Sequence, residues 1–130
     1  MYWLVKSDPE EYSFENLLKD GKASWDGIRN YAARNHMKAM KKGDKVLVYH
    51  SGGISAVVGT ATVTKAFYRD PTADDDTWVS VELKAGKALE KPVTLAEIKK
   101  DKRLKDMILL KISRLSVMPV TEEEFTIISS

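Results

Sequence analysis

The sequence predicts an α+β protein in which a small curved sheet or barrel is packed by short helices. Short β-branched and aromatic segments, typical of strands, alternate along the chain with segments that carry helix-capping signals. The 130 residues are 43% hydrophobic and 31% charged, which is ordinary for one folded domain. No internal repeat and no linker rich in proline, glycine or serine divides the chain. We therefore expect a single domain over residues 1–130.

The first half of the chain predicts two strands and two helices. Residues 2–6 are aromatic and β-branched, and they indicate an opening strand. Ser13 offers a cap for a short helix that ends near Gly21. A longer helix is expected from Asn30, with apolar side chains on one face and basic side chains on another. The almost unbroken apolar run at residues 45–50 then predicts a buried strand.

The second half predicts further strands and two more helices. Apolar side chains recur at alternate positions over residues 57–64 and 78–84, which is the period of a half-buried strand. Thr94 and Thr121 each begin a capping-box pattern, in which a hydroxyl residue is followed three positions later by glutamate. Each pattern predicts the start of a helix. A late strand is expected within residues 109–118.

The composition excludes several kinds of site. The chain has no cysteine, which excludes disulfides, thiolate zinc sites and cysteine nucleophiles. It has two histidines and no dinucleotide or phosphate-loop fingerprint, so we expect neither a metal site nor a cofactor. No apolar run approaches the length of a membrane span, and no apolar leader precedes the domain. These observations predict a cytoplasmic protein with no membrane partner.

Charge is unevenly distributed, although the net charge is only +2. Arg34, Lys38 and Lys42 share one face of the helix expected from Asn30, where they could bind phosphates without reading a base sequence. An acidic segment at residues 70–76 stands against them. On charge alone, a solvated surface is the simpler interpretation.

Aromatic residues beside small polar groups are the more informative feature. They occur in three segments, Trp3–Pro9, Trp25–Tyr31 and Tyr49–Gly53, each where an expected strand or turn gives way to a loop. A nucleobase stacks on an indole or phenol ring for about 1–3 kcal/mol, and amide, hydroxyl or imidazole groups can read its edge. The pattern predicts an aromatic-lined pocket beside a basic surface.

The same residues also have purely structural interpretations. Trp3 can be a core residue of the first strand, and Trp25 can fill the core beneath a helix start. Tyr49 can be buried in the sheet, and Asn30 can be no more than a helix N-cap. Tyr68, before a turn, can be a pocket wall or an exposed loop residue. These alternatives stay open on the sequence alone.

An enzyme site is the weaker interpretation. His50 and Ser51 are the only adjacent histidine and serine, but neighbouring residues on a strand point to opposite faces and do not meet. A histidine that is hydrogen-bonded at a strand end accounts better for His50. We predict no catalytic residue.

Six stretches along the whole chain together resemble the EVE domain family, of the thymocyte nuclear protein type. This family belongs to the PUA-like group, which also includes YTH domains. The stretches are YWLVKSDPEEYS at 2–13, WDGIRNYAARN at 25–35, GDKVLVYHS at 43–51, VVGTATV at 57–63, YRDPT at 68–72 and RLSVMPV at 114–120. Each motif is short, but together they occur in order over essentially the entire sequence.

The resemblance implies a PUA-like curved β-barrel of about five to six strands flanked by short helices. It also implies a non-catalytic reader of nucleic acid whose pocket holds a flipped, modified base, with modified cytosine in DNA favoured. The alternatives are an RNA-binding module of the same group, a small nucleotide-directed enzyme that uses His50, and an interaction module with a filled core. The candidate base-pocket residues are Trp3, Ser7, Trp25, Gly27, Arg29, Asn30, Tyr49, His50, Ser51 and Tyr68, and the candidate phosphate-binding residues are Arg34, Lys38 and Lys42.

Overall fold

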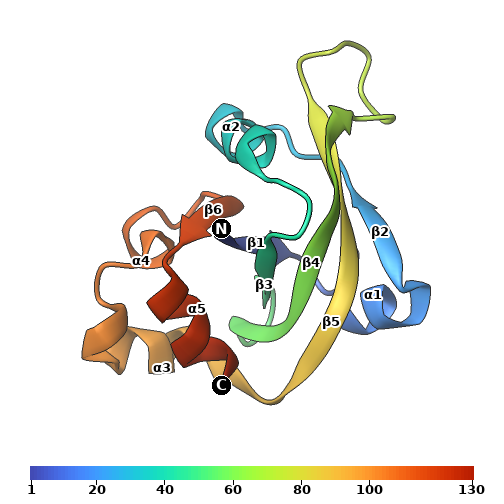
Figure 1. Ribbon diagram of the computed structural model, residues 1–130. Coiled ribbons are helices and arrows are strands. Elements are labelled where there is room, and N and C mark those ends of the chain that lie inside the picture. Colours follow the sequence, from blue (N-terminus) through green and yellow to red (C-terminus); the bar gives the residue numbers. More distant parts are fainter.

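A six-stranded mixed sheet forms the centre of the computed structural model, which describes residues 1–130 (Figure 1). The strands are ordered β2-β5-β4-β3-β1-β6, and β1 pairs in parallel with β3 and antiparallel with β6. The two edge strands, β2 and β6, do not pair with each other, so the curved sheet stays open and does not close into the barrel that the family resemblance implied. The α+β class is confirmed. The strands are β1 (Tyr2–Ser7), β2 (Lys22–Trp25), β3 (Lys45–His50), β4 (Ala56–Arg69), β5 (Val79–Thr94) and β6 (Val117–Val120).

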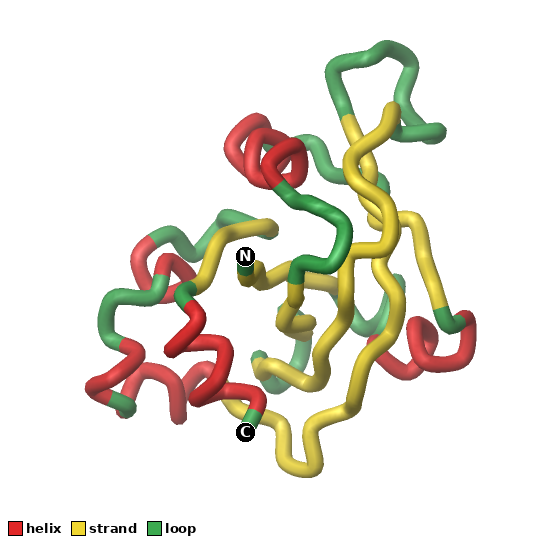
Figure 2. The backbone as a smooth tube through the Cα atoms, in the orientation of Figure 1, coloured by secondary structure: helices red, strands yellow, loops and turns green.

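Short helices cover the sheet. Figure 2 shows α3, α4 and α5 gathered on one side of the molecule and α1 on the other, with α2 above the middle of the sheet. A 3-10 turn at Lys102–Leu104 follows α3. The helices are α1 (Phe14–Asp20), α2 (Tyr31–Ala39), α3 (Leu95–Lys100), α4 (Ile108–Lys111) and α5 (Glu122–Ser129).

The helix starts confirm the capping patterns in the sequence. The side chains of Ser13, Thr94 and Thr121 each accept a hydrogen bond from the backbone N–H three residues later, and each forms a capping box. Asn30 caps α2 in the same way, through the N–H of Ala33. A cap of this kind contributes about 1 kcal/mol, which matters for helices of only a few turns.

Strands β1 and β3 are neighbours in the interior of the sheet, and consecutive residues of both strands are buried, so both of their faces are covered. This explains their unbroken apolar runs, because a strand that is buried on both faces has no polar alternation. Residues 3–5 and 46–49 are all buried. Gly59 on β4 lies directly beneath α1, where a Cβ atom would stand 2.3 Å from the ring of Phe14. The glycine therefore permits the close packing of helix on strand.

The outer strands differ from the sequence-based prediction. Strand β2 was not predicted, and β4 and β5 are 14 and 16 residues long, well beyond the expected segments at 57–64 and 78–84. Much of the added length is exposed, and several register shifts interrupt the pairing of β4 with β5. The first part of the expected late strand is helix α4, and β6 begins at Val117. The β4–β5 hairpin extends beyond the sheet and past α2 (Figure 1).

Candidate nucleic-acid interface

A cavity of about 530 Å³ lies where three segments meet: the end of β1, the loop that leads into α1, and the segment from β2 towards α2. This volume is within the ordinary range of small-ligand sites. The cavity combines aromatic rings with hydroxyl and carboxyl groups. Its lining residues are Lys6, Ser7, Asp8, Glu11, Tyr12, Ala23, Ser24, Trp25, Asp26, Gly27 and Ile28.

Two aromatic side chains, together with Ala23 and Ile28, form the apolar part of the lining. Trp25 also belongs to the hydrophobic core, with 7% of the residue exposed, and its ring meets the ring of Tyr12 edge to face at a centroid distance of 6.0 Å. The Tyr12 hydroxyl donates a hydrogen bond to Asp20 Oδ2 at 2.8 Å. Burial and the Asp20 carboxylate together raise the pKa of Tyr12 to about 12, so the phenol stays neutral. Tyr12 was not among the predicted site residues, although it lies within the first motif of the family resemblance.

The polar groups of the cavity come mainly from strand ends. The Ser7 hydroxyl donates to the carbonyl of Tyr12, which joins β1 to the loop before α1. Burial raises the pKa of Asp26, and the negative charge of Asp70 raises it further. An aspartate in such surroundings can accept a hydrogen bond when ionised and donate one when protonated. The cavity therefore offers both donors and acceptors to the edge of a planar ligand.

Asp70 connects the cavity to the β4–β5 hairpin. Its carboxylate is fully buried and accepts hydrogen bonds from the Gly27 amide at 2.8 Å and from Arg29 Nη1 at 2.9 Å. It also accepts from the backbone and the hydroxyl of Thr72. Burial alone would raise the pKa of Asp70, but the hydrogen bonds from Thr72, Arg29 and Gly27 outweigh it and lower the pKa to about 2. The loop on which the cavity depends is thus tied to the hairpin by an ionised group.

The structure places the predicted pocket residues in different surroundings. Ser7, Trp25 and Gly27 line the cavity. Trp3 and Tyr49 lie in the core with 2% and 3% of each residue exposed, so neither forms a wall of the cavity. In both cases the structural alternative weighed from the sequence describes their surroundings, because the central strands are covered on both faces.

Other predicted residues stand around the cavity without lining it. The Asn30 side chain is engaged as the cap of α2, and Arg29 pairs with Asp70. The backbone N–H of Ser51 donates to the carbonyl of Ser7 at 3.0 Å, and the Tyr68 hydroxyl shares a hydrogen bond of 2.7 Å with Ser24. These residues support the lining. Their roles in binding stay predictions.

His50 serves the start of α1. Its Nε2 atom accepts a hydrogen bond from the backbone N–H of Phe14 at 3.0 Å, which requires the neutral imidazole. Burial lowers the pKa of His50, although the carboxylate of Glu15 acts in the opposite direction. A histidine held in this way at a strand end matches the structural interpretation drawn from the sequence.

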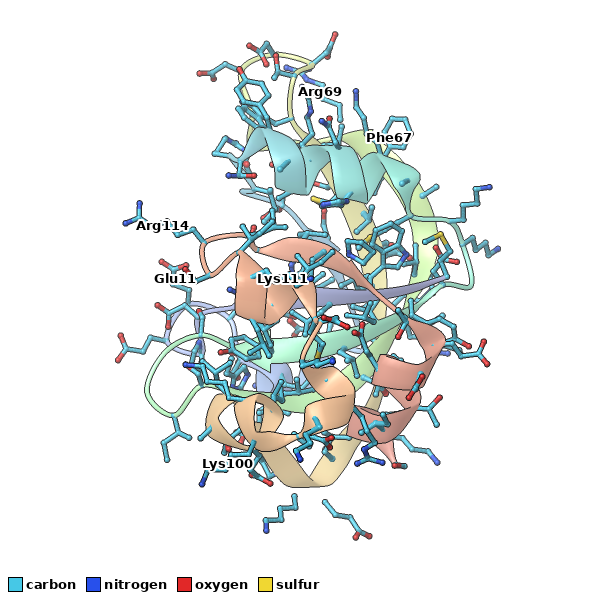
Figure 3. All side chains as sticks on the ribbon, turned by 90° about the vertical axis from the view of Figure 1, so that its left-hand side faces the viewer. Glu11, Phe67, Arg69, Lys100, Lys111 and Arg114 are labelled. Atoms are coloured by element: carbon cyan, nitrogen blue, oxygen red, sulfur yellow. The ribbon has the colours of Figure 1, made fainter.

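Of the three predicted phosphate-binding residues, Arg34 and Lys38 lie on α2, and Lys42 lies in the turn after the helix. Lys38 and Lys42 are exposed and Arg34 is half-buried. Lys38 Nζ lies 5.9 Å from the ring centroid of Phe67 on β4. Figure 3 shows Phe67 and Arg69 on the side of the hairpin that accompanies α2. The basic face of α2 and the hairpin therefore form one continuous surface.

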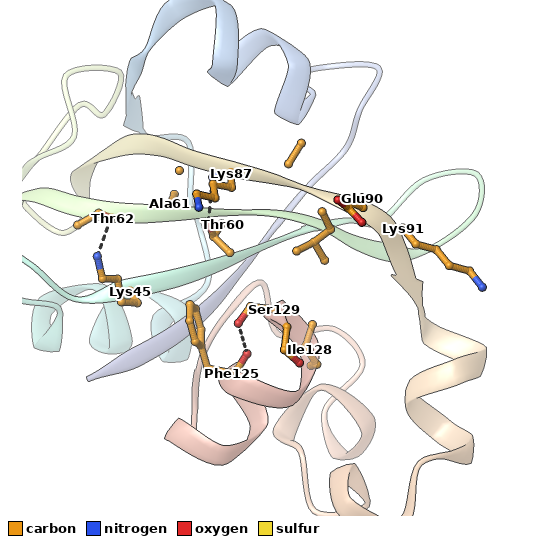
Figure 4. A pocket seen from close by; sticks show the side chains of 14 residues that line it. Lys45, Thr60, Ala61, Thr62, Lys87, Glu90, Lys91, Phe125, Ile128 and Ser129 are labelled. Carbon is orange, nitrogen blue, oxygen red and sulfur yellow. Dashed lines mark hydrogen bonds between the residues drawn. The ribbon is translucent and has the colours of Figure 1, made fainter.

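A second and larger cavity, of about 690 Å³, lies between the β4–β5 pair and α5 (Figure 4). It is lined by side chains such as Lys45, Thr62, Lys87 and Phe125. It contains none of the predicted base-pocket residues, and its single aromatic ring gives a base no paired aromatic wall. The smaller cavity at Trp25 is the better candidate because it combines two rings with polar groups.

Two further observations limit the kinds of site in this chain. No three side chains of histidine, aspartate or glutamate gather in a way that could hold a metal ion. None of the helices combines the length and the hydropathy needed to cross a membrane.

Nearly the whole of this chain is similar in sequence and structure to known proteins. A family model described as the EVE domain matches residues 1–130. Mouse thymocyte nuclear protein 1 is 34% identical over 163 aligned residues, which cover 99% of this chain and 72% of the mouse protein. A solved structure from Rhodopseudomonas palustris has 45% identity and a TM-score of 0.93, covering 98% of this chain and 90% of that one. The structure of human THYN1 protein in complex with 5-methylcytosine-containing DNA has 31% identity and a TM-score of 0.90, covering 97% and 94%.

These relatives correct one expectation and establish the family. The mouse and human relatives are named as nuclear proteins, which points away from a purely cytoplasmic location, and the prediction of a cytoplasmic protein is wrong. It rested on the lack of a leader and of an apolar span, and neither feature distinguishes the cytoplasm from the nucleus. The family resemblance read from the six motifs is confirmed by the match over residues 1–130 and by identities above 30% with relatives aligned over nearly the whole chain. This chain belongs to the EVE domain family.

Proposed function

We propose that this protein is a non-catalytic reader that holds one flipped, modified base of a nucleic acid in the cavity beside Trp25. The cavity itself carries the proposal, because two aromatic rings and several polar groups converge on a space of about 530 Å³. The complex of human THYN1 with 5-methylcytosine-containing DNA supports modified cytosine in DNA as the preferred target.

The energetics of base flipping are consistent with such a cavity. Taking a base out of a duplex costs a few kcal/mol, and stacking returns about 1–3 kcal/mol per base. Trp25 and Tyr12 supply the rings, and their edge-to-face contact keeps both in place. Hydrogen bonds to the base edge must supply the remainder. A buried methyl group adds about 0.8 kcal/mol, or roughly fourfold in affinity, which sets the scale of discrimination between plain and methylated cytosine.

Asp26 is the group that favours cytosine among the pyrimidines. Its carboxylate can accept a hydrogen bond from the exocyclic amino group of cytosine, whereas thymine and uracil present an oxygen at that position. Its position in the cavity lining, next to Trp25, suits this role. Arg34, Lys38 and Lys42 would bind the flanking phosphates and add affinity that does not depend on sequence.

The proposal is tested by titrating matched oligonucleotides against the protein at stated salt. The set contains plain and modified cytosine or adenine, each in DNA and in RNA, and anisotropy gives the dissociation constant. We expect the tightest binding to DNA with modified cytosine. Preferential binding of RNA would favour the RNA-binding alternative over a reader of DNA. Turnover of an oligonucleotide that disappears in His50→Ala would contradict a non-catalytic role.

Two variants test the cavity itself. Trp25→Ala should weaken binding of the modified DNA by about tenfold or more, and Trp25→Phe should retain part of the affinity because a ring remains. Circular dichroism and thermal unfolding check that each variant is folded. Thr126→Ala, at an exposed position on α5, a helix that contributes no residue to the cavity lining, serves as the control. Unchanged affinity in a folded Trp25→Ala protein would refute the assignment of this cavity.

A further inference from the structure

Four side chains outside the cavity stack on one another across the gap between α2 and the β4–β5 hairpin. The Arg29 guanidinium lies 5.6 Å from the ring centroid of Trp78, and the Trp78 and Tyr31 rings are 5.0 Å apart at an interplanar angle of 38°. The Arg34 guanidinium in turn lies 5.0 Å from the Tyr31 ring. We call these four residues, together with Lys38 and Phe67, the stacking face.

Two of the three rings of the stacking face are open to solvent, and the third, Trp78, is half-buried. Tyr31 is 63% exposed and Phe67 is 47% exposed, and each has a cation close to its ring. Proteins that hold unpaired nucleic acid combine a basic groove with rings on which bases stack, and arginine adds cation–π attraction. Three cations accompany three rings here, so the surface matches both the phosphates and the bases of a nucleic acid strand.

The stacking face is held in place before any ligand arrives. The Arg34 guanidinium donates to the side-chain oxygen of Asn35 at 2.9 Å and to the carbonyl of Thr77. The Arg29 guanidinium is bound to the buried carboxylate of Asp70. Because both arginines are already ordered, a ligand would lose little of its binding free energy to fixing their side chains.

The stacking face begins beside the candidate base cavity. Ile28 lines that cavity and is followed directly by Arg29, the first member of the face. The same Asp70 carboxylate accepts from the Gly27 amide and from Arg29, so the cavity and the face share one support. A nucleotide adjacent to a base in the cavity would therefore lie next to this face.

The acidic hairpin tip limits where a strand can run. Asp74 and Asp76 are exposed, and only Asp76 is paired, with Arg69 at 3.2 Å. Phosphates would be repelled at this tip and attracted along α2. The favoured path is therefore from the cavity along the helix.

We propose that the stacking face binds an unpaired nucleobase that flanks the flipped one, with this second base stacked on Tyr31 and its phosphates bound by Arg34 and Lys38. This inference rests on the proposed function, since it names a second contact for the same nucleic acid. It makes the protein a reader of a locally opened strand, in which one base enters the cavity and its neighbour leaves the helical stack.

Fluorescence of 2-aminopurine tests this stacking directly. The probe replaces the base on either side of the modified cytosine, in single-stranded and duplex DNA. Wild-type protein and Tyr31→Phe should quench the probe at one of the two positions, because a ring is present to stack on it. Tyr31→Ala should remove this quenching and weaken binding by about tenfold, with no change in the ratio of affinities for modified and plain DNA. Because Tyr31 is exposed, the variant should unfold at the wild-type temperature.

The salt dependence separates stacking from charge. Arg34→Gln should reduce the slope of log affinity against log salt by about one, whereas Tyr31→Ala should leave the slope unchanged. The inference is overturned if Tyr31→Ala binds as tightly as wild type, or if the probe is quenched equally by both proteins. If Trp25→Ala loses binding while Tyr31→Ala binds as wild type does, the stacking face is rejected as a contact and the assignment of the cavity stands. Loss of binding in Tyr31→Ala together with wild-type binding in Trp25→Ala would reject the cavity, and with it the proposal that the base at Tyr31 flanks a flipped one.

Discussion

The segments before and after helix α2 are each bound by an aspartate, but the two aspartates hold different parts of the molecule. Beyond the C-terminal end, Asp44 accepts from the chain terminus at 3.0 Å, from the Trp3 indole at 2.9 Å and from the Lys41 amide. Before the N-terminal end, Asp70 accepts from Gly27, Arg29 and Thr72. The first binds core elements together, and the second binds the loops around the cavity.

This difference shows that an aspartate with several hydrogen-bond donors can stabilise the fold at one position and support a binding cavity at another. Both carboxylates face several donors, and the pKa of each is lowered although burial acts in the opposite direction. Only Asp70 contacts residues that line or adjoin the cavity. Removing Asp44 should therefore affect the fold alone, and removing Asp70 should affect the fold and binding together.

The largest effect is expected from Asp70→Asn. A neutral amide cannot balance Arg29 or accept from all the donors around this buried position, so we expect a loss of about 2–3 kcal/mol in the free energy of unfolding. Binding of modified DNA should weaken as well, because the Gly27 loop loses its support. Urea unfolding and anisotropy measure the two quantities. Asp44→Asn is the matched variant and should lose stability but retain binding; a comparable loss of affinity in both would contradict the division of roles.

The pH dependence of stability provides the second test. The pKa of Asp70 is about 2 in the folded protein and near 3.8 when unperturbed, so the folded state favours the ionised form. Its contribution, about 2 kcal/mol, is fully present above pH 4 and is lost as the pH falls towards 2. Unfolding free energies measured from pH 7 to 2 should fall less steeply in Asp70→Asn than in wild type. Identical acid dependence in the two proteins would exclude this linkage.

Trp3 and Trp25 provide a third test of this comparison, with smaller expected changes in stability and affinity. Trp3→Phe removes the donor to Asp44 and should cost about 1 kcal/mol of stability with no change in DNA affinity. Trp25→Phe keeps a ring in the cavity and should lower the affinity severalfold with a smaller change in stability. Thermal unfolding and anisotropy on both variants measure the contrast. A loss of affinity in Trp3→Phe would place that residue at the site after all.

The smallest expected effect concerns His50. Burial lowers its pKa in the folded protein, so protonation favours the unfolded state, and its contribution declines as the pH falls below about 6.5. Unfolding temperatures compared at pH 7.5 and 5.5 should drop slightly more in wild type than in His50→Gln. The opposite order would show that His50 is charged in the folded protein.

Local signals predicted much of the fold and less of the site. The caps at Ser13, Asn30, Thr94 and Thr121 were confirmed because a cap depends only on residues a few positions apart. Strand β2 and the outer lengths of β4 and β5 were missed because many of their residues are exposed and are stabilised by pairing with another strand, which no local pattern shows. Asp70 was missed as a site residue for the same reason, since its partner Arg29 is 41 positions away.

The sequence by itself determined the helix caps, the unbroken apolar strands β1 and β3 and the family, all of which depend on residue types and short spacings. The tertiary structure decided which aromatic residues face a cavity and which fill the core. It also decided that the sheet stays open and that Asp70 joins the cavity loop to the hairpin. The physical reason is that burial and pairing depend on the elements packed around a residue, and those elements come from distant parts of the chain.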